Sequence, residues 1–221
     1  IESVLFQKFK NYEYIIVDGF SDDGTSELIQ RHYKNNKNLK YFRYRDTGIY
    51  DALNFALKKA TGKYIGIIHS GDIYYSDVIL KNISKKTKNR DFLFGNIEFF
   101  NNEIEISRSW KFKTKKYNEK NFYKIAHPSL FIKKKIAIQL EYDTKNKISS
   151  DSKFIIDLLK KSDKYFYLNY PIQFMNSYGL SNNIKFFHVK MIEDFKILYQ
   201  KYNFLFLYIY IKKELSKVNH V

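Results

Sequence analysis

Short apolar runs and helical apolar spacings alternate along the first hundred residues. Runs rich in β-branched and aromatic residues occur at Glu13 to Asp18 (EYIIVD), Leu39 to Tyr44 and Tyr64 to Ile68 (YIGII), a pattern typical of buried parallel strands. Between them, a helix is expected to begin at Thr25 and another to cover 49–60. This alternation predicts an α/β fold whose mostly parallel sheet has right-handed crossovers and flanking helices.

The pattern becomes less regular from about residue 91. Four further strands are expected, at 91–96, 97–110, 129–132 and 165–168. A helix should follow Asp151, and the C-terminus should be helical from Phe186 onward. We therefore expect a first half (1–96), a mixed α+β half of the same domain (97–181) and a helical C-terminal tail (182–221).

Composition limits the class of protein. The 221 residues are 44% hydrophobic and 19% aromatic, enough for one substantial core and against intrinsic disorder. The formal net charge of +16 would attract phosphates, nucleic acid or an anionic membrane, although a general compositional bias explains it equally well. With no cysteine, a disulfide framework and a thiolate zinc site are excluded, which suits a reducing cytoplasm.

The sequence has no apolar run of about 18 residues and no signal-type start. Its tail from Tyr199 to Lys213 places apolar residues between lysines, which fits a core helix or a segment resting on an anionic leaflet. We therefore expect a cytoplasmic protein, with peripheral contact at the inner face of the plasma membrane as the alternative.

Four acids follow the predicted strands of the first half: Asp18, Asp46, Asp51 and Asp72. Because the carboxyl ends of parallel strands meet at one sheet edge, we expect these carboxylates to lie close together. Carboxylates gathered in this way repel one another unless a cation offsets them, so a divalent metal is expected there. Each acid taken alone could equally be a helix N-cap or a turn former.

Three segments carry a resemblance to a known family. They are EYIIVDGFSDDGT (13–25), RDTGIYDALNFALKKATGKYIGIIHSGD (45–72) and ISSDSKFIIDLL (148–159). In order and spacing they resemble the signatures of family 2 glycosyltransferases, in particular the bacterial branch that builds capsule, O-antigen and exopolysaccharide. The resemblance spans roughly 1–181 and implies a GT-A fold, which is Rossmann-like.

The resemblance implies roles on the donor side. Asp18 matches the acid that accepts an N–H of uracil or another base, and Ser21 lies in the same loop. Asp46 and Asp51 match the segment beside the base and ribose, although Asp51 could instead only fix the helix that follows it.

Asp72 matches the last acid of the DxD-type motif, which binds Mn²⁺ or Mg²⁺ at the donor diphosphate. Gly71 before it would let the backbone approach a phosphate closely. Many relatives hold two or three acids where this chain has His69, Ser70 and Gly71, so we expect weak metal binding without donor.

On the acceptor side, Asp151 matches the general base that deprotonates the acceptor hydroxyl in an inverting transfer. An N-cap role for Asp151 is compatible with that chemistry. His127 matches a position near the acceptor, and a satisfied structural histidine is an equally good interpretation. Ser181 lies in a late small-residue turn and could reach a donor phosphate.

The function expected is transfer of a sugar from a nucleotide-diphosphate sugar, with UDP as the expected nucleotide, to a saccharide or lipid-linked hydroxyl in cell-surface polysaccharide synthesis. The family's opening strand would precede Ile1, so we expect the chain to lack it. A truncated transferase that only binds donor is therefore one alternative. A basic nucleic-acid-binding module is another, but nothing in the sequence supports a groove-reading element, and no nucleic acid partner is expected.

Overall fold

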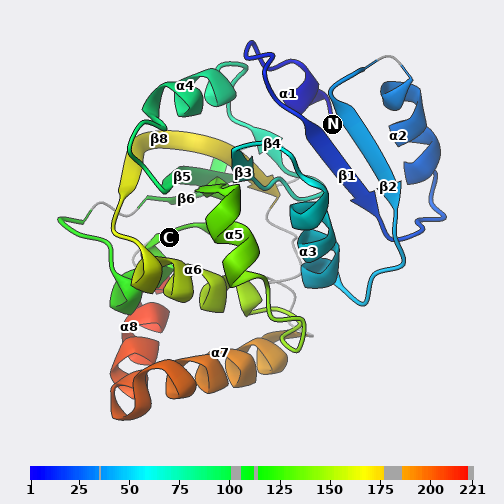
Figure 1. Ribbon diagram of the computed structural model, residues 1–221. Helices are drawn as coiled ribbons and strands as arrows, with labels where there is room; N and C mark the ends of the chain where they lie inside the picture. The colour runs from blue at the N-terminus through cyan, green and yellow to red at the C-terminus, as the bar shows by residue number, and fades with distance from the viewer. Residues whose placement is uncertain (35, 101–105, 112–113, 177–185, 219–221) are drawn as a thin grey trace.

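The computed structural model describes residues 1–34, 36–100, 106–111, 114–176 and 186–218 (Figure 1). Its helices are α1 (Glu2–Leu5), α2 (Thr25–Tyr33), α3 (Ile49–Lys59), α4 (Ile79–Lys86), α5 (Lys134–Leu140), α6 (Ser150–Lys161), α7 (Phe187–Tyr202) and α8 (Phe206–Val218). Short 3₁₀ helices are η1 (Glu119–Lys124), η2 (His127–Ser129) and η5 (Asn203–Leu205). The strands are β1 (Tyr14–Asp18), β2 (Leu39–Arg43), β3 (Tyr64–Gly66), β4 (Ile73–Tyr74), β5 (Phe92–Phe100), β6 (Ile106–Trp110), β7 (Phe131–Lys133) and β8 (Tyr165–Asn176).

A small parallel sheet forms the N-terminal side of the molecule. β1 and β2 run in parallel with Tyr14 opposite Leu39 and Asp18 opposite Arg43, joined by α2 as a βαβ crossover requires. α3 packs on β1 between this pair and the rest of the chain (Figure 1). Among the described residues, β1 pairs only with β2 and β3 pairs only with β7. The two sheets therefore share no backbone pairing.

A second sheet of six strands forms the centre, in the order β3-β7-β5-β8-β4 with β6 paired to β5. β5 and β8 are parallel, whereas β3–β7, β5–β7, β4–β8 and β5–β6 are antiparallel. The α/β class, the mixed character expected for the second half and the helical C-terminus are confirmed. β3 of the first half pairs antiparallel with β7. Because β7 lies far along the chain, the local apolar pattern around β3 does not show the direction of this pairing.

Apolar side chains cover both faces of the central sheet. One cluster joins Phe92 and Phe94 of β5 to α3, α5, α6, η1 and the inner sides of α7 and α8. The other joins Leu93 of β5 to Ile79 and Ile83 of α4 and to Val4 of α1. Successive residues of β5 thus point to opposite faces, as the period of a strand demands, and helices close each face.

The C-terminal helices form a hairpin below α6 (Figure 1). α7 buries only a narrow stripe, which includes Ile197 and Leu198, and α8 buries Ile209. Aromatic contacts join the two helices, with the Phe195 and Phe206 ring centroids 4.7 Å apart. Within the described residues, none of the helices has the length and apolar character needed to cross a bilayer.

Candidate functional site

Asp18 at the end of β1 is 4% exposed and organises the loop after it. Its Oδ1 accepts hydrogen bonds from the backbone N–H and hydroxyl of Ser21, at 3.0 and 2.5 Å. Its Oδ2 accepts from the hydroxyls of Ser26 and Tyr41, both at 2.8 Å. Burial alone would raise the pKa of Asp18, but these donors hold it at about 2. The predicted base contact stays a prediction, and in this conformation the carboxylate is occupied by the chain itself.

Phe20 lies in the same loop with unusual backbone geometry. Its φ is +66°, which is rare for a bulky residue, and its side chain is 45% exposed. The guanidinium of Arg43 lies 4.5 Å from the ring centroid and that of Arg45 lies 5.6 Å from it. An exposed aromatic ring between two arginines, held in a strained conformation, is a feature that the sequence pattern did not reveal.

The loop after β2 lies close to the loop after β1. A Cβ on Gly19 would lie 2.9 Å from Oδ2 of Asp46, so the glycine permits this close approach. Asp46 itself accepts from the backbone N–H of Gly48 at 3.0 Å. Asp51, in the first turn of α3, accepts from the backbone N–H and hydroxyl of Thr47 at 2.9 and 3.1 Å. These bonds lower the pKa of Asp51 and fit the interpretation in which it fixes the helix start.

Asp72 occupies the turn between β3 and β4. Gly71 before it has φ +89°, a conformation that favours glycine. The Asp72 side chain is 8% exposed; Oδ1 accepts from the backbone N–H of Asn176 at 3.2 Å, and Oδ2 has no partner among the described residues. Burial raises the pKa of Asp72 to about 6. Asp72 is a desolvated carboxylate, and in the part of the chain that the structure describes no positive charge contributes to its pKa.

A buried aromatic and histidine cluster lies behind Asp72. The backbone carbonyl of His69 accepts from the N–H of Asp72 at 3.1 Å. Its ring lies 6.1 Å from that of His127, and Nε2 of His127 is 2.8 Å from the hydroxyl of Tyr142. Burial lowers the pKa of His127 to about 4, so the ring is neutral at pH 7 and matches the satisfied structural histidine. His127 is 6% exposed.

Asp151 lies in the first turn of α6 and faces this cluster. Its negative charge acts on both histidines, where it opposes the lowering of their pKa values by burial. Its Oδ1 accepts from the backbone N–H of Ser152 at 2.7 Å. His69 thus hydrogen-bonds with Asp72 through its backbone and lies within reach of the charge of Asp151, although the two acids are far apart in sequence. The sequence motif alone does not show this relation between His69 and Asp151.

The expected cluster of four acids does not form as one metal site. Asp18 ends β1, Asp46 lies in the loop after β2 and Asp51 lies in the first turn of α3, and each accepts a hydrogen bond from a residue near it in the chain. Across the described residues, no group of three or more His, Asp or Glu side chains could hold a metal ion. The reason is the break between the sheets, because the carboxyl ends of β1 and β3 belong to different sheets. Asp72, with an unpartnered buried oxygen, fits a cation as a single protein ligand.

Two remaining features lie outside this site. Ser181 is outside the described residues. A cavity of about 840 Å³ opens at the other end of β3, and its walls contain none of the predicted site residues. Its lining is basic: Lys63, Lys85, Lys88, Lys133, Lys134 and Lys135.

The family profile of glycosyl transferase family 2 matches residues 1–141, which is more than half of the chain. The protein therefore belongs to glycosyl transferase family 2, and its enzyme class is that of a transferase.

Relatives carry the same name. A glycosyltransferase of Methanocaldococcus jannaschii, described as uncharacterized, is 30% identical over 192 residues, covering 80% of this chain and 66% of that protein. A similarly described one from Rickettsia felis is 37% identical over 99 residues, 45% of this chain and 16% of the relative. WfgD of Escherichia coli, a UDP-Glc:alpha-D-GlcNAc-diphosphoundecaprenol beta-1,3-glucosyltransferase, is 34% identical over 109 residues, 49% of this chain and 43% of the relative. The aligned part thus spans between about one sixth and two thirds of these relatives.

Solved structures show the fold. Staphylococcus aureus TarS 1-349 in complex with UDP-GlcNAc matches with a TM-score of 0.68 at 18% identity, covering 90% of this chain and 61% of that one. The mannosyltransferase PcManGT from Pyrobaculum calidifontis in complex with GDP-Man and Mn²⁺ matches with a TM-score of 0.57 at 16% identity, covering 78% and 50%. The GT-A fold expected from the sequence is confirmed.

Proposed function

We propose that the chain transfers a sugar from a UDP-sugar to a hydroxyl of a saccharide or lipid-linked acceptor, with inversion, in the synthesis of a cell-surface polysaccharide. The observation that carries this proposal is that His69 accepts a hydrogen bond from the backbone of Asp72, and that the charge of Asp151 acts on the His69 ring. A group suited to the donor diphosphate and a group suited to the acceptor hydroxyl thus share one site. Residues 1–96 form the donor half and 97–181 the acceptor half, with the division inside β5.

The donor side is formed by the loops after β1 and β2. The Asp18 network fixes the shape of the first loop, and Asp46 and Asp51 shape the second. Arg43 and Arg45 place positive charge beside the exposed ring of Phe20. An aromatic face for a base and two cations for phosphates are the chemistry that a nucleotide sugar requires. The UDP-GlcNAc in TarS and the UDP-Glc in the name of WfgD favour uridine as the base.

Asp72 is the residue that would hold Mn²⁺ or Mg²⁺, with Gly71 letting the backbone come close to a phosphate. A bound divalent cation supplies positive charge that offsets the charge of the leaving nucleotide. The Mn²⁺ in PcManGT supports a metal in this fold. Because burial raises the pKa of Asp72 to about 6, donor and metal binding should require deprotonation and weaken below that pH.

Asp151 is the proposed general base. It accepts the proton of the acceptor hydroxyl as that oxygen forms a bond to the anomeric carbon of the donor. The bond from that carbon to the diphosphate oxygen breaks on the opposite face, so the configuration inverts. The neighbouring histidines, with lowered pKa values, are neutral and do not compete for the negative charge of Asp151.

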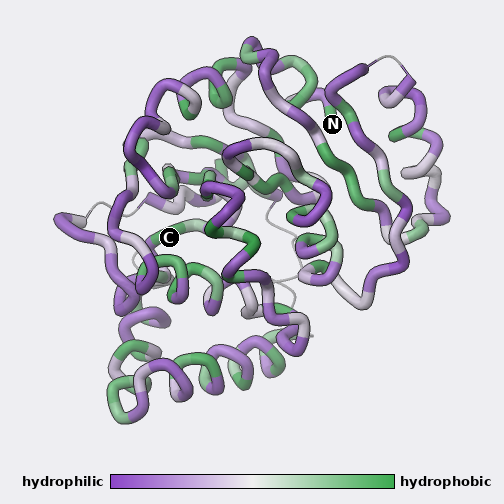
Figure 2. The backbone as a smooth tube through the Cα atoms, in the orientation of Figure 1, coloured by the Kyte–Doolittle hydropathy of each residue, from purple (hydrophilic) through white to green (hydrophobic). Residues whose placement is uncertain are grey.

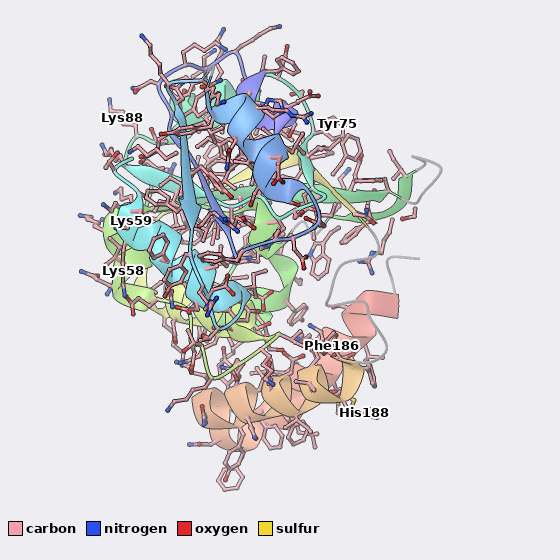
Figure 3. The ribbon with its side chains drawn as sticks, turned by 90° about the vertical axis from the view of Figure 1, so that its right-hand side faces the viewer. Lys58, Lys59, Tyr75, Lys88, Phe186 and His188 are labelled. Carbon is pink, nitrogen blue, oxygen red and sulfur yellow. The ribbon has the colours of Figure 1, made fainter. Side chains whose placement is uncertain are left out.

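The C-terminal hairpin is proposed to contact an anionic membrane surface. Apolar residues recur along α7 and α8 among hydrophilic ones (Figure 2), and Phe204 between the helices is 99% exposed. The amino end of α7, with Phe186 and His188, lies at the outer edge of the molecule (Figure 3). Exposed apolar residues are Phe187, Met191, Ile192, Phe195, Tyr199, Leu205, Leu207, Tyr208, Ile211 and Leu215. Glu193 and Asp194 are buried, so lysines dominate the outward charge, which suits acidic headgroups.

Sedimentation with vesicles tests the membrane contact. Binding should be seen with phosphatidylglycerol vesicles, weaken with salt and fall in Phe204→Ser. Equal binding to phosphatidylcholine vesicles, or none to either, would contradict the proposal.

The transfer itself is tested by isothermal titration and UDP release with UDP-glucose and UDP-N-acetylglucosamine, in Mn²⁺ and in EDTA. Asp72→Asn should lose the Mn²⁺-dependent part of donor binding, while Asp151→Asn should bind donor normally and lose turnover by about 10²-fold or more. Asp77→Asn is the matched control, since Asp77 is an exposed carboxylate in the connection after β4 that forms an ion pair with Lys8 at the surface. Unchanged turnover in Asp151→Asn would remove it as the base.

A further inference from the structure

Glu193 of α7 binds the segment that leads into α6. Its Oε1 accepts from the backbone N–H of Lys147 at 2.7 Å, and its Oε2 accepts from those of Ile148 and Ser149, both at 2.9 Å. The side chain is 8% exposed. One carboxylate therefore satisfies three backbone donors just before the helix start, where N–H groups lack partners and negative charge is favoured.

The same segment is held from the other side by α3. The hydroxyl of Tyr50, a residue 7% exposed, donates to the carbonyl oxygen of Ile148 at 2.5 Å. Burial raises the pKa of Tyr50, and the negative charge of Asp151 raises it further. Residues 147–149 are thus fixed by a carboxylate from α7 and a phenol from α3, two residues before the proposed base.

α7 is itself anchored, so Glu193 is not a free surface group. Asp194 beside it forms an ion pair with Lys213 of α8 at 2.5 Å, and both side chains are buried. Burial would raise the pKa of Asp194, but the charge of Lys213 holds it below its usual value. A second ion pair joins Lys201 of α7 to Asp157 of α6. The hairpin is therefore a rigid support against which the segment can be positioned.

We infer that Glu193 is a positioning residue that sets the location of Asp151 during transfer, which makes the C-terminal hairpin part of the catalytic machinery. This inference rests on the proposed role of Asp151. The physical reason is that Asp151 follows residues 147–149 closely in the chain, and the backbone N–H groups of 147–149 are all held by the Glu193 carboxylate. A shift of about 1 Å in a reacting group can cost about 10²-fold in rate.

The test is Glu193→Gln, in the full chain, assayed by UDP release from UDP-glucose and UDP-N-acetylglucosamine with Mn²⁺. Glutamine keeps one acceptor oxygen, but its NH₂ group faces a backbone N–H and cannot accept from it. We expect kcat to fall by about ten-fold with the donor dissociation constant unchanged. We also expect amide exchange at 147–149 to speed up by about ten-fold.

Asp157→Asn is the matched control, because it breaks the Lys201 ion pair between α6 and α7 and leaves 147–149 untouched. It should keep kcat and the exchange of 147–149. If Asp157→Asn lowers kcat as much as Glu193→Gln does, the effect is general loosening of α7 and the inference is wrong. Unchanged exchange and kcat in Glu193→Gln would overturn it as well.

A double variant separates this inference from the proposed function. If Glu193 acts through Asp151, adding Glu193→Gln to Asp151→Asn should lower the residual kcat by less than about two-fold. A further ten-fold loss would show that Glu193 acts elsewhere. If Asp151→Asn alone keeps full kcat, the proposed base is wrong, whereas a large loss there with normal kcat in Glu193→Gln would leave the base in place and remove only the positioning role.

Discussion

The two sheets of the molecule are buried to different degrees. In β5 of the central sheet every residue from Phe92 to Ile97 is buried, whereas in β1 of the small sheet only Asp18 is, and in β2 only Leu39. β5 pairs with strands on both sides, while β1 pairs only with β2 among the described residues. Apolar burial therefore stabilises the central sheet far more than the small one.

Of the predicted donor residues, Gly71 lies between β3 and β4 of the central sheet, whereas Asp18, Ser21 and Asp46 lie at or after the ends of β1 and β2 in the less buried sheet. There, a polar network around Asp18 holds the loop in place of a large apolar core. On the central sheet, Asp151 and His127 lie against the main apolar cluster, which includes Phe154. The proposed donor side is thus held by hydrogen bonds of a polar network, whereas the region of the proposed base is held by apolar packing.

The largest effect is expected from a core deletion in the central sheet. Phe94 is 1% exposed and packs on Tyr117 with ring centroids 4.7 Å apart. Phe94→Ala should lower the free energy of unfolding by about 3–5 kcal/mol. Ile16→Ala in the half-buried β1 should cost roughly 1–2 kcal/mol, since less apolar area is lost. Urea unfolding measures both, and equal losses would remove the contrast between the sheets.

A smaller effect is expected in the pH dependence of stability, which differs between His127 and Asp18. The pKa of His127 is lowered to about 4 in the folded protein, so the unfolded chain binds a proton first and stability falls as pH drops from about 6.5. Between pH 7 and pH 5, the free energy of unfolding of His127→Gln should fall by roughly 2 kcal/mol less than that of the wild type. The raised pKa of Asp72 makes the folded protein more stable as pH falls through this range. This contribution is the same in the wild type and in His127→Gln, so it cancels when the two are compared.

Asp18 contributes to stability over a different pH range. Because its folded pKa is lowered to about 2, its stabilisation is present above about pH 4 and is lost only as pH falls towards 2. Urea titrations at several pH values check this order. If His127→Gln follows the wild type from pH 7 to pH 5, burial of a neutral His127 is not the cause of the acid sensitivity.

The smallest effect is local and concerns the polar network. Asp18→Asn keeps one acceptor oxygen but removes the charge that four hydrogen bonds share, so it should cost about 1 kcal/mol. Amide exchange should then speed up by about five-fold in β1 and β2 and stay unchanged in β5. Equal acceleration in both sheets would mean that they unfold together and that the small sheet is not a separate unit of stability.

Local patterns were sufficient for most elements of the first half, although β4 (Ile73–Tyr74) and α4 (Ile79–Lys86) were not predicted. The apolar runs ending at Asp18 and beginning at Tyr64 are strands, and the expected helix over 49–60 is α3 (Ile49–Lys59). In the second half, the strands expected at 91–96 and 97–110 are instead β5 (Phe92–Phe100) and β6 (Ile106–Trp110). β5 is buried on both faces, so its apolar run shows no alternation that would mark where it ends.

The sequence by itself determined the family, the acids that follow the strands of the first half and most of the βα alternation there, because motifs and periodicities are local properties of the chain. Only the tertiary structure decided that β1 and β3 lie in different sheets, that the charge of Asp151 reaches His69, and that Glu193 holds 147–149. These relations join residues far apart in the chain. They depend on packing and desolvation after the layers have come together, which no local period encodes.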